Sequence, residues 1–136
     1  MSLPKKIIIL NLIFLLFTIC CNKTFQIEKI HGTWESENNG INLTIIFKKN
    51  NNCEMKFYHE DSKKTELIKG IYNFNYIKNP ISLDIKKISN LQNSLYTIVD
   101  IVDENSIRIA KFSPKWRQRP IFFNKKNTID LKRRSF

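Results

Sequence analysis

The sequence predicts an all-β fold, a small antiparallel up-and-down barrel of about eight strands that follows an N-terminal signal helix. Three observations lead to this prediction. After residue 31 the chain consists of short segments in which apolar and polar residues alternate with a period of two. Clusters of turn-forming residues separate these segments. No segment after residue 31 offers three turns of helical periodicity, and closure of the sheet would protect the edges of such short strands.

The alternation is clearest in the first predicted hairpin. From residue 41 to residue 48, apolar side chains alternate with Asn, Thr and Lys, and only Ile46 is out of place. The cluster Lys49–Asn52 then supplies a turn, because Asn tolerates the left-handed conformations that tight turns require. A second turn cluster, Asp103–Asn105, separates two later segments. The strands predicted in this way are residues 41–48, 53–58, 67–77, 81–86, 95–102, 107–112, 121–123 and 128–131.

A short motif stands before this series of strands. Residues 32–34 are Gly-Thr-Trp, preceded by His31. The motif resembles the start of a lipocalin-like (calycin) barrel, whose first strand carries Gly-x-Trp. The resemblance implies that Trp34 packs across the closed end of the barrel, beneath an arginine that stacks on its ring as a cation. Arg133 and Arg119 are the two candidates for that arginine.

Three further strings resemble a small uncharacterised bacterial domain, best known from planctomycetes, which also begins with Gly-Thr-Trp. They are Lys-Gly-Ile-Tyr at residues 69–72, Lys-Asn-Pro-Ile-Ser-Leu-Asp at 78–84 and Arg-Pro-Ile-Phe-Phe at 119–123. The strings are short, but they occur in the same order as in that family. The resemblance covers residues 31–134 and implies an architecture, a lipocalin-like barrel, without an activity. The connection after Asp84 departs from the pattern, because it lacks the expected Gly.

The N-terminal segment has the layout of a secretory signal peptide. Lys5 and Lys6 precede an apolar run that ends at the pair Cys20-Cys21. From Ile7 to Cys21 the run has 15 residues. It is therefore shorter than the roughly 20 apolar residues that a membrane span needs, although an uncleaved N-terminal anchor is the alternative. A cysteine at the cleavage site resembles a bacterial lipoprotein signal, in which that cysteine carries the lipid, with acyl chains such as palmitate.

Either cysteine of the pair can carry this lipid. We favour Cys21, because cleavage before it places the small Cys20 next to the scissile bond; cleavage before Cys20 is the alternative. The predicted organisation is a signal peptide over residues 1–20, a tether or short helix over 21–30 and the barrel over 31–134. Such a protein is exported and lipid-anchored to the bacterial cell membrane or outer membrane.

Whether the third cysteine, Cys53, has a possible disulfide partner depends on which cysteine carries the lipid. If Cys21 carries the lipid, Cys53 has no intrachain partner, whereas lipidation of Cys20 would let Cys21 and Cys53 pair in an oxidising exterior. The simpler interpretation, which we favour, is that Cys53 is a small buried apolar residue at the start of a strand.

The sequence points away from an enzyme. Its carboxylates are scattered, apart from Glu60-Asp61 and Asp103-Glu104, which lie in turn clusters where solvated residues are expected. His59 beside Glu60-Asp61 is too small a ligand set for a structural zinc site. We therefore predict neither a catalytic residue nor a metal or cofactor.

Positive charge is concentrated near the C-terminus. The net charge is +11, and residues 22–107 are neutral, with 11 basic and 11 acidic residues. Residues 108–136 carry ten basic residues and only Asp130 as an acid. We predict a basic surface that contacts an anionic envelope component; alternatively, these are solvated residues at a barrel end, with Trp116 covering the core. Because the protein is expected to be exported, we do not expect the basic surface to bind nucleic acid. The predicted surface comprises Lys115, Trp116, Arg117, Arg119, Lys132, Arg133 and Arg134.

Two functions are consistent with these features. In the first, a monomeric, membrane-anchored barrel binds a small apolar ligand in its interior, as lipocalin-like barrels do. In the second, the domain is an interaction module that docks on an anionic envelope component or a protein partner through its basic C-terminal end. The candidate interior residues are Phe47, Phe57, Tyr72, Phe74 and Tyr96.

Overall fold

The computed structural model describes residues 29–36, 42–89 and 91–135. The chain divides into two compact units, Met1–Ile30 and His31–Phe136. Of the first unit only residues 29 and 30 are described, and they are helical. The predicted signal helix and both candidate lipid sites, Cys20 and Cys21, lie outside the described residues. Within the described ranges no helix combines the length and the apolar character needed to cross a membrane.

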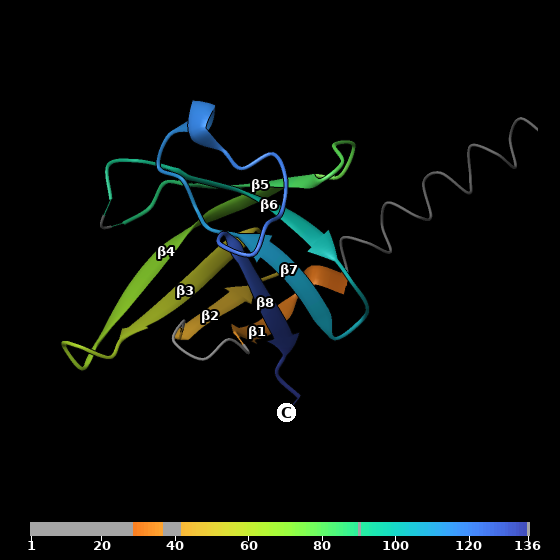
Figure 1. Cartoon of the computed structure of the whole chain (residues 1–136). Helices are drawn as coiled ribbons and strands as arrows, with labels where there is room; N and C mark the ends of the chain where they lie inside the picture. Colours follow the sequence, from red (N-terminus) through yellow and green to blue (C-terminus); the bar gives the residue numbers. More distant parts are fainter. Residues whose placement is uncertain (1–28, 37–41, 90, 136) are drawn as a thin grey trace, which may run out of the picture. The chain divides into compact units, whose positions relative to one another are not determined.

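The second unit is an eight-stranded antiparallel barrel, which confirms the predicted fold class (Figure 1). Each strand pairs with its neighbours in the sequence, and the first pairs with the last. Such next-neighbour order is typical of a meander with local turns. The strands are β1 (Gly32–Ser36), β2 (Asn42–Phe47), β3 (Asn52–His59), β4 (Lys64–Asn75), β5 (Ile81–Lys86), β6 (Leu95–Ile101), β7 (Ser106–Ala110) and β8 (Thr128–Arg133).

One predicted strand is wrong. Residues 121–123 form no strand and belong to the connection between β7 and β8, in which Ile121 and Phe122 are exposed. Pro120 precedes them and has no N–H to donate to a ladder. The eighth strand is instead β1, which carries the Gly-Thr-Trp motif. In the middle of the chain, β4 is longer than predicted at its start, since it begins at Lys64.

The inner face of the barrel is filled by the apolar half of the alternating pattern. Trp34, Ile45, Met55 and Ile68 lie opposite one another across four strands and are at most 5% exposed. Residues directly opposite in a ladder share a face, so this register identifies the inner wall. The other inward positions that are at most 6% exposed are Leu43, Phe47, Cys53, Tyr72, Leu83, Ile85, Thr97, Val99, Ile107, Ile109, Ile129 and Leu131.

Closure of the barrel brings Arg133 onto Trp34. The two residues are cross-strand partners in β1 and β8, and the guanidinium carbon lies 4.3 Å from the centre of the indole ring. Arg133 also donates from Nη1 to the carbonyl of His31, at 2.5 Å, and from Nε to that of Glu104, at 3.0 Å. Of the two predicted candidates, Arg133 is therefore the arginine that stacks on Trp34.

Gly32 makes this contact possible. Its φ is +128°, a conformation that side chains other than Gly rarely adopt. A Cβ placed there would lie 2.7 Å from Nη1 of Arg133. The Gly-x-Trp motif thus supplies both the ring and the space for the cation.

Replacing Arg133 with Ala should destabilise the barrel by ~2 kcal/mol, because it removes a half-buried cation–ring contact together with two hydrogen bonds to backbone carbonyls. Arg134→Ala is the matched control. Arg134 pairs with Glu35 at 3.1 Å, but its side chain is 61% exposed, so its loss should cost less than ~0.5 kcal/mol. Urea unfolding of both variants measures the difference, and equal losses would contradict the role assigned to Arg133.

Burial also makes Cys53 a source of pH dependence. Its thiol is buried as predicted, and burial raises its pKa from 9.0 to about 11. Between these values the unfolded state releases a proton that the folded state keeps. The contribution of the Cys53 thiol to the free energy of unfolding is therefore fully present below pH 9 and is lost as the pH rises toward 11. The loss should be on the order of 3 kcal/mol. Unfolding curves of the protein and of Cys53→Ala across this window test it, since the variant should lose this part of the pH dependence.

Candidate functional site

Three of the predicted interior residues meet inside the barrel. The rings of Phe47 and Tyr72 are 5.0 Å apart, and Phe74 lies 5.4 Å from Phe47 and 5.5 Å from Tyr72. The Tyr72 hydroxyl donates to the carbonyl of Lys48 at 2.7 Å. These rings contact one another edge to face or tilted, as aromatic groups in a packed core do. Phe57, on the same inner wall opposite Leu43, is half-buried.

Tyr96, the fifth predicted interior residue, lies on the outer wall. Its cross-strand partner is Asp84, whereas its neighbour Thr97 pairs with the buried Leu83. The prediction failed because β6 is apolar on both faces, and its alternation therefore does not distinguish the inner wall from the outer one. Ile98, also on the outer face, is only 3% exposed, so another part of the chain covers this wall.

Tyr76 was not predicted as a site residue, although it continues the face of Tyr72 and Phe74. Its ring lies 5.5 Å from that of Phe74, and its hydroxyl is buried without a hydrogen-bond partner. Burial raises the pKa of this phenol. A buried hydroxyl without a partner is unusual in a folded protein and marks a position that can take an acceptor.

Three surface hollows are lined by described residues, with volumes of about 440, 320 and 260 Å³. The largest lies over β3 and β4, where Lys48 contacts Glu54 at 2.6 Å. That hydrogen bond lowers the pKa of the Glu54 carboxyl. The second lies over β1, β2 and β3. The third lies between the β4–β5 turn and the connection from β7 to β8.

The connection between β7 and β8, residues 111–127, covers the outer wall of β5 and β6, and we call it the flap (Figure 1). Ser113 forms two backbone hydrogen bonds with Tyr96, both of 2.9 Å, where the flap joins β6. A single 3-10 turn, η1 (Trp116–Gln118), follows. The flap then passes over Asp84 and borders the third hollow with Pro120 and Ile121.

Arg119 fastens the middle of the flap to the barrel. Its Nη2 pairs with the Asp84 carboxylate, and its guanidinium carbon lies 5.3 Å from the centre of the Tyr96 ring. The side chains of Arg119 and Asp84 are only 12% and 17% exposed. Arg119 was predicted as part of the basic surface or as the partner of Trp34. It is instead an anchor, because Asp84 and Tyr96 hold it against the outer wall.

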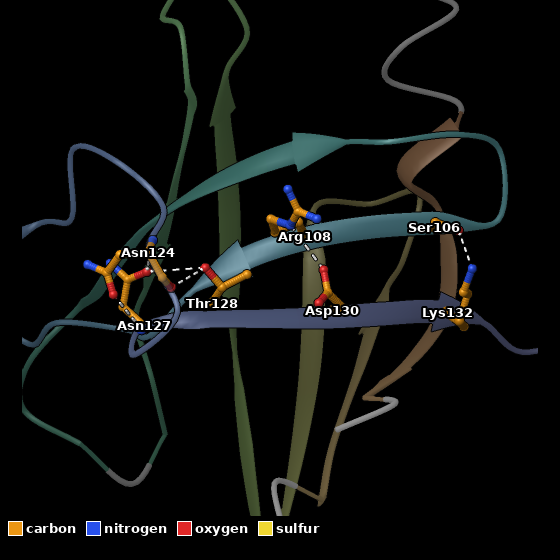
Figure 2. Close-up of polar contacts among 7 residues, drawn as sticks. All are labelled: Ser106, Arg108, Asn124, Asn127, Thr128, Asp130 and Lys132. Atoms are coloured by element: carbon orange, nitrogen blue, oxygen red, sulfur yellow. Dashed lines mark hydrogen bonds and ion pairs between the residues drawn. The ribbon is translucent and has the colours of Figure 1, made fainter. Parts of the chain in front are cut away.

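The far end of the flap is fixed by an asparagine turn (Figure 2). The Thr128 hydroxyl donates to the carbonyl of Asn124 at 2.6 Å, and the backbone N–H of Asn124 donates to the Asn127 side chain at 2.9 Å. The Asn127 amide donates to the carbonyl of Phe122 at 3.1 Å. The flap is thus held at its start, its middle and its end.

The predicted basic surface does not gather in one place. Lys132 lies at the end of β8 opposite to the flap (Figure 2), Arg133 is the last residue of that strand, and Arg134 follows it. Lys132 donates to the Ser106 hydroxyl at 2.7 Å, and the other two have the partners described above. A strand rises about 3.3 Å per residue, so Lys132 lies roughly 13 Å along β8 from Thr128, where the flap ends. The basic residues that remain near Trp116 are Lys115 and Arg117.

The flap and the β4–β5 turn carry the most exposed apolar groups of the described residues. These are Ile77, Ile121, Trp116 and Phe122, with exposures between 61% and 86%. Trp116 therefore does not cover the core, which was the alternative interpretation. The flap also contains six basic residues and no acid. Five of them are exposed and form no ion pair within the described ranges: Lys111, Lys115, Arg117, Lys125 and Lys126.

Comparison of the chain with protein-family models, with curated proteins and with solved structures finds no match. Among the described residues no three His, Cys, Asp or Glu side chains are grouped closely enough to hold a metal ion.

The anchoring role of Arg119 predicts a local effect. Arg119→Met removes the closer of the two cations that pair with Asp84 and leaves only Lys86, at 3.9 Å. Amide hydrogen exchange in residues 113–121 should therefore accelerate by at least about tenfold, with a stability loss of ~2 kcal/mol. Arg117→Met, two residues away and exposed, should change neither. Exchange measured by mass spectrometry on both variants tests this, and equal protection of the flap in both would show that Arg119 does not hold it.

Proposed function

We propose that this protein is a monomeric, exported, non-enzymatic lipoprotein, anchored through Cys21 or Cys20, whose flap contacts an anionic lipid surface of the bacterial envelope. The observation that carries the proposal is that the four most exposed large apolar side chains all lie on the flap and the adjoining β4–β5 turn. Water-exposed aromatic and aliphatic groups beside free cations suit a membrane interface, where the rings enter the headgroup region.

The charge of the flap supports the same surface. Each Lys or Arg close to an anionic leaflet contributes ~1 kcal/mol, and the effect falls off within a Debye length. The five exposed, unpaired cations of the flap could thus contribute several kcal/mol together, beyond the apolar contacts of Trp116 and its neighbours. With no acid in the flap, nothing within it opposes this attraction.

Rigid presentation and tethering strengthen a contact of this kind. Because Arg119 and the asparagine turn fix the flap, little conformational entropy is lost when its tip binds. A lipid at the N-terminus would keep the domain beside the same membrane, so that individually weak contacts act at a high local concentration.

The fluorescence of Trp116 tests the proposal in the full chain. We expect its emission to shift to the blue in vesicles that contain phosphatidylglycerol, compared with phosphatidylcholine alone, because the indole leaves water. Lys115→Gln with Arg117→Gln should weaken this contact about thirtyfold, since two cations at ~1 kcal/mol each are lost. High salt should have the same direction of effect.

Two controls isolate the signal. Trp116→Phe leaves only the buried Trp34 and supplies the background. Lys49→Gln with Lys64→Gln removes the same charge from exposed positions outside the flap. An emission of Trp116 that does not depend on lipid charge, or an equal effect of the two double variants, would contradict the proposal.

A second candidate function is the binding of a small apolar ligand inside the barrel. The buried Tyr76 hydroxyl without a partner favours it, because such a group could donate to a ligand that lies against Phe74. Native mass spectrometry of the gently extracted protein should then detect a bound lipid or acyl compound. The apo mass alone would exclude this candidate.

A further inference from the structure

The third hollow, of about 260 Å³, lies where the flap meets the β4–β5 turn. Lys78 and Asn79 come from the turn, Ser82 from β5, Ile98 from β6, and Arg119 with Ile121 from the flap. Segments far apart in the sequence therefore build it, and the anchor of the flap forms part of its wall. In Figure 1 the η1 turn and the β4–β5 turn both project to the upper side of the view.

The polar part of the hollow suits an anion. Lys78 is exposed and forms no ion pair within the described ranges. Asp84, which does not line the hollow, is shared by Arg119 and by Lys86, the latter at 3.9 Å. Among the described residues, the lining of the hollow thus contains two cations, Lys78 and Arg119, and no acidic residue. The hydrogen bonds of Arg119 use only Nη2, and its Nε is buried without a partner, so the guanidinium retains N–H donors.

The apolar part of the hollow and its size restrict the ligand further. Ile98, Ile121 and two prolines complete the lining, and the exposed Ile77 adjoins Lys78 in the turn. An inorganic anion would leave these groups without a contact, whereas an amphiphile would use both parts. The volume lies below the roughly 300–1,000 Å³ of sites that enclose drug-sized ligands. The hollow thus suits a head group and not a whole lipid.

We propose that this hollow binds the phosphodiester head group of an anionic glycerolipid, with Lys78 and Arg119 supplying the charge and Ile121 lying along the apolar part of the lipid. This inference rests on the proposed contact between the flap and a membrane, and it names the lipid group that the contact selects. Charge-assisted contacts to phosphate oxygens are strong and directional, so the hollow would give the flap a preference beyond general attraction to negative charge.

Amide NMR of the full chain in phosphatidylcholine nanodiscs tests the site with soluble probes. Glycerophosphoglycerol should produce saturable shifts at residues 78–82 and 119–121. Lys78→Ala should weaken its binding roughly fivefold, and Lys49→Ala, an exposed lysine of the β2–β3 turn, should not. Inorganic phosphate should bind more weakly and leave the Ile121 amide unshifted.

The outcomes separate this inference from the function on which it rests. Equal binding and equal shifts with inorganic phosphate would reduce the site to one for a free anion and overturn the inference. The absence of saturable shifts in the hollow, with the Trp116 response to phosphatidylglycerol intact, would overturn the head-group site alone. Saturable binding without any Trp116 response would support the head-group site and contradict the membrane contact of the flap.

Discussion

The ion pair between Arg119 and Asp84 decides where the flap, the proposed contact surface of this protein, lies. It holds the flap against the outer wall of β5 and β6, where Tyr96 completes the contact through its ring. A largely buried ion pair contributes little net stability compared with an apolar replacement, but it is costly to break and can fix one arrangement of the chain. Here the arrangement turns Trp116 and Ile121 outward while Ile98 stays covered.

Because the barrel is closed and its interior is packed with side chains, its outer surface is the more suitable place to bind a partner. An eight-stranded barrel has an interior just wide enough for its own side chains or for one small ligand. In this chain aromatic rings occupy much of that space, and Arg133 stacks on Trp34 where β1 meets β8. Closure also removes the sheet edges through which open sheets recognise partners. Long connections are then the natural place for recognition, and the flap is the longest of those described.

The fold could be predicted because most strands have one apolar face. Alternation located β2, β3 and β5 to within a residue or two, and the Gly-Thr-Trp motif marked β1. The prediction failed in β6, where both faces of the strand are buried and apolar and polar residues therefore do not alternate. In β6 the core covers Thr97 and the flap covers Ile98, so both faces are apolar or buried and Tyr96 was assigned to the wrong side. Residues 121–123 were predicted as a strand because they are apolar, but they belong to the flap, where Ile121 and Phe122 are exposed instead of paired in a sheet.

The candidate site depended on contacts that local patterns do not contain. The sequence could not choose between Arg119 and Arg133 as the partner of Trp34, because that choice follows from the pairing of the first strand with the last. Lys132–Arg134 lie at the end of β8 away from Lys115 and Arg117, although the excess of basic residues over 108–136 predicted one common basic surface. The run of cations beside Trp116 was visible in the sequence, but the ion pair that presents it was not.

Paramagnetic relaxation in the full chain, reconstituted in nanodiscs with spin-labelled phosphatidylglycerol, tests the central claim most directly. If the flap is the contact surface, amide signals of residues 77–78 and 115–122 should broaden most, and those of the β3–β4 turn at residues 60–63 should remain sharp. Broadening confined to the β3–β4 turn, or changes only at the interior rings of Phe47, Tyr72 and Phe74, would contradict it.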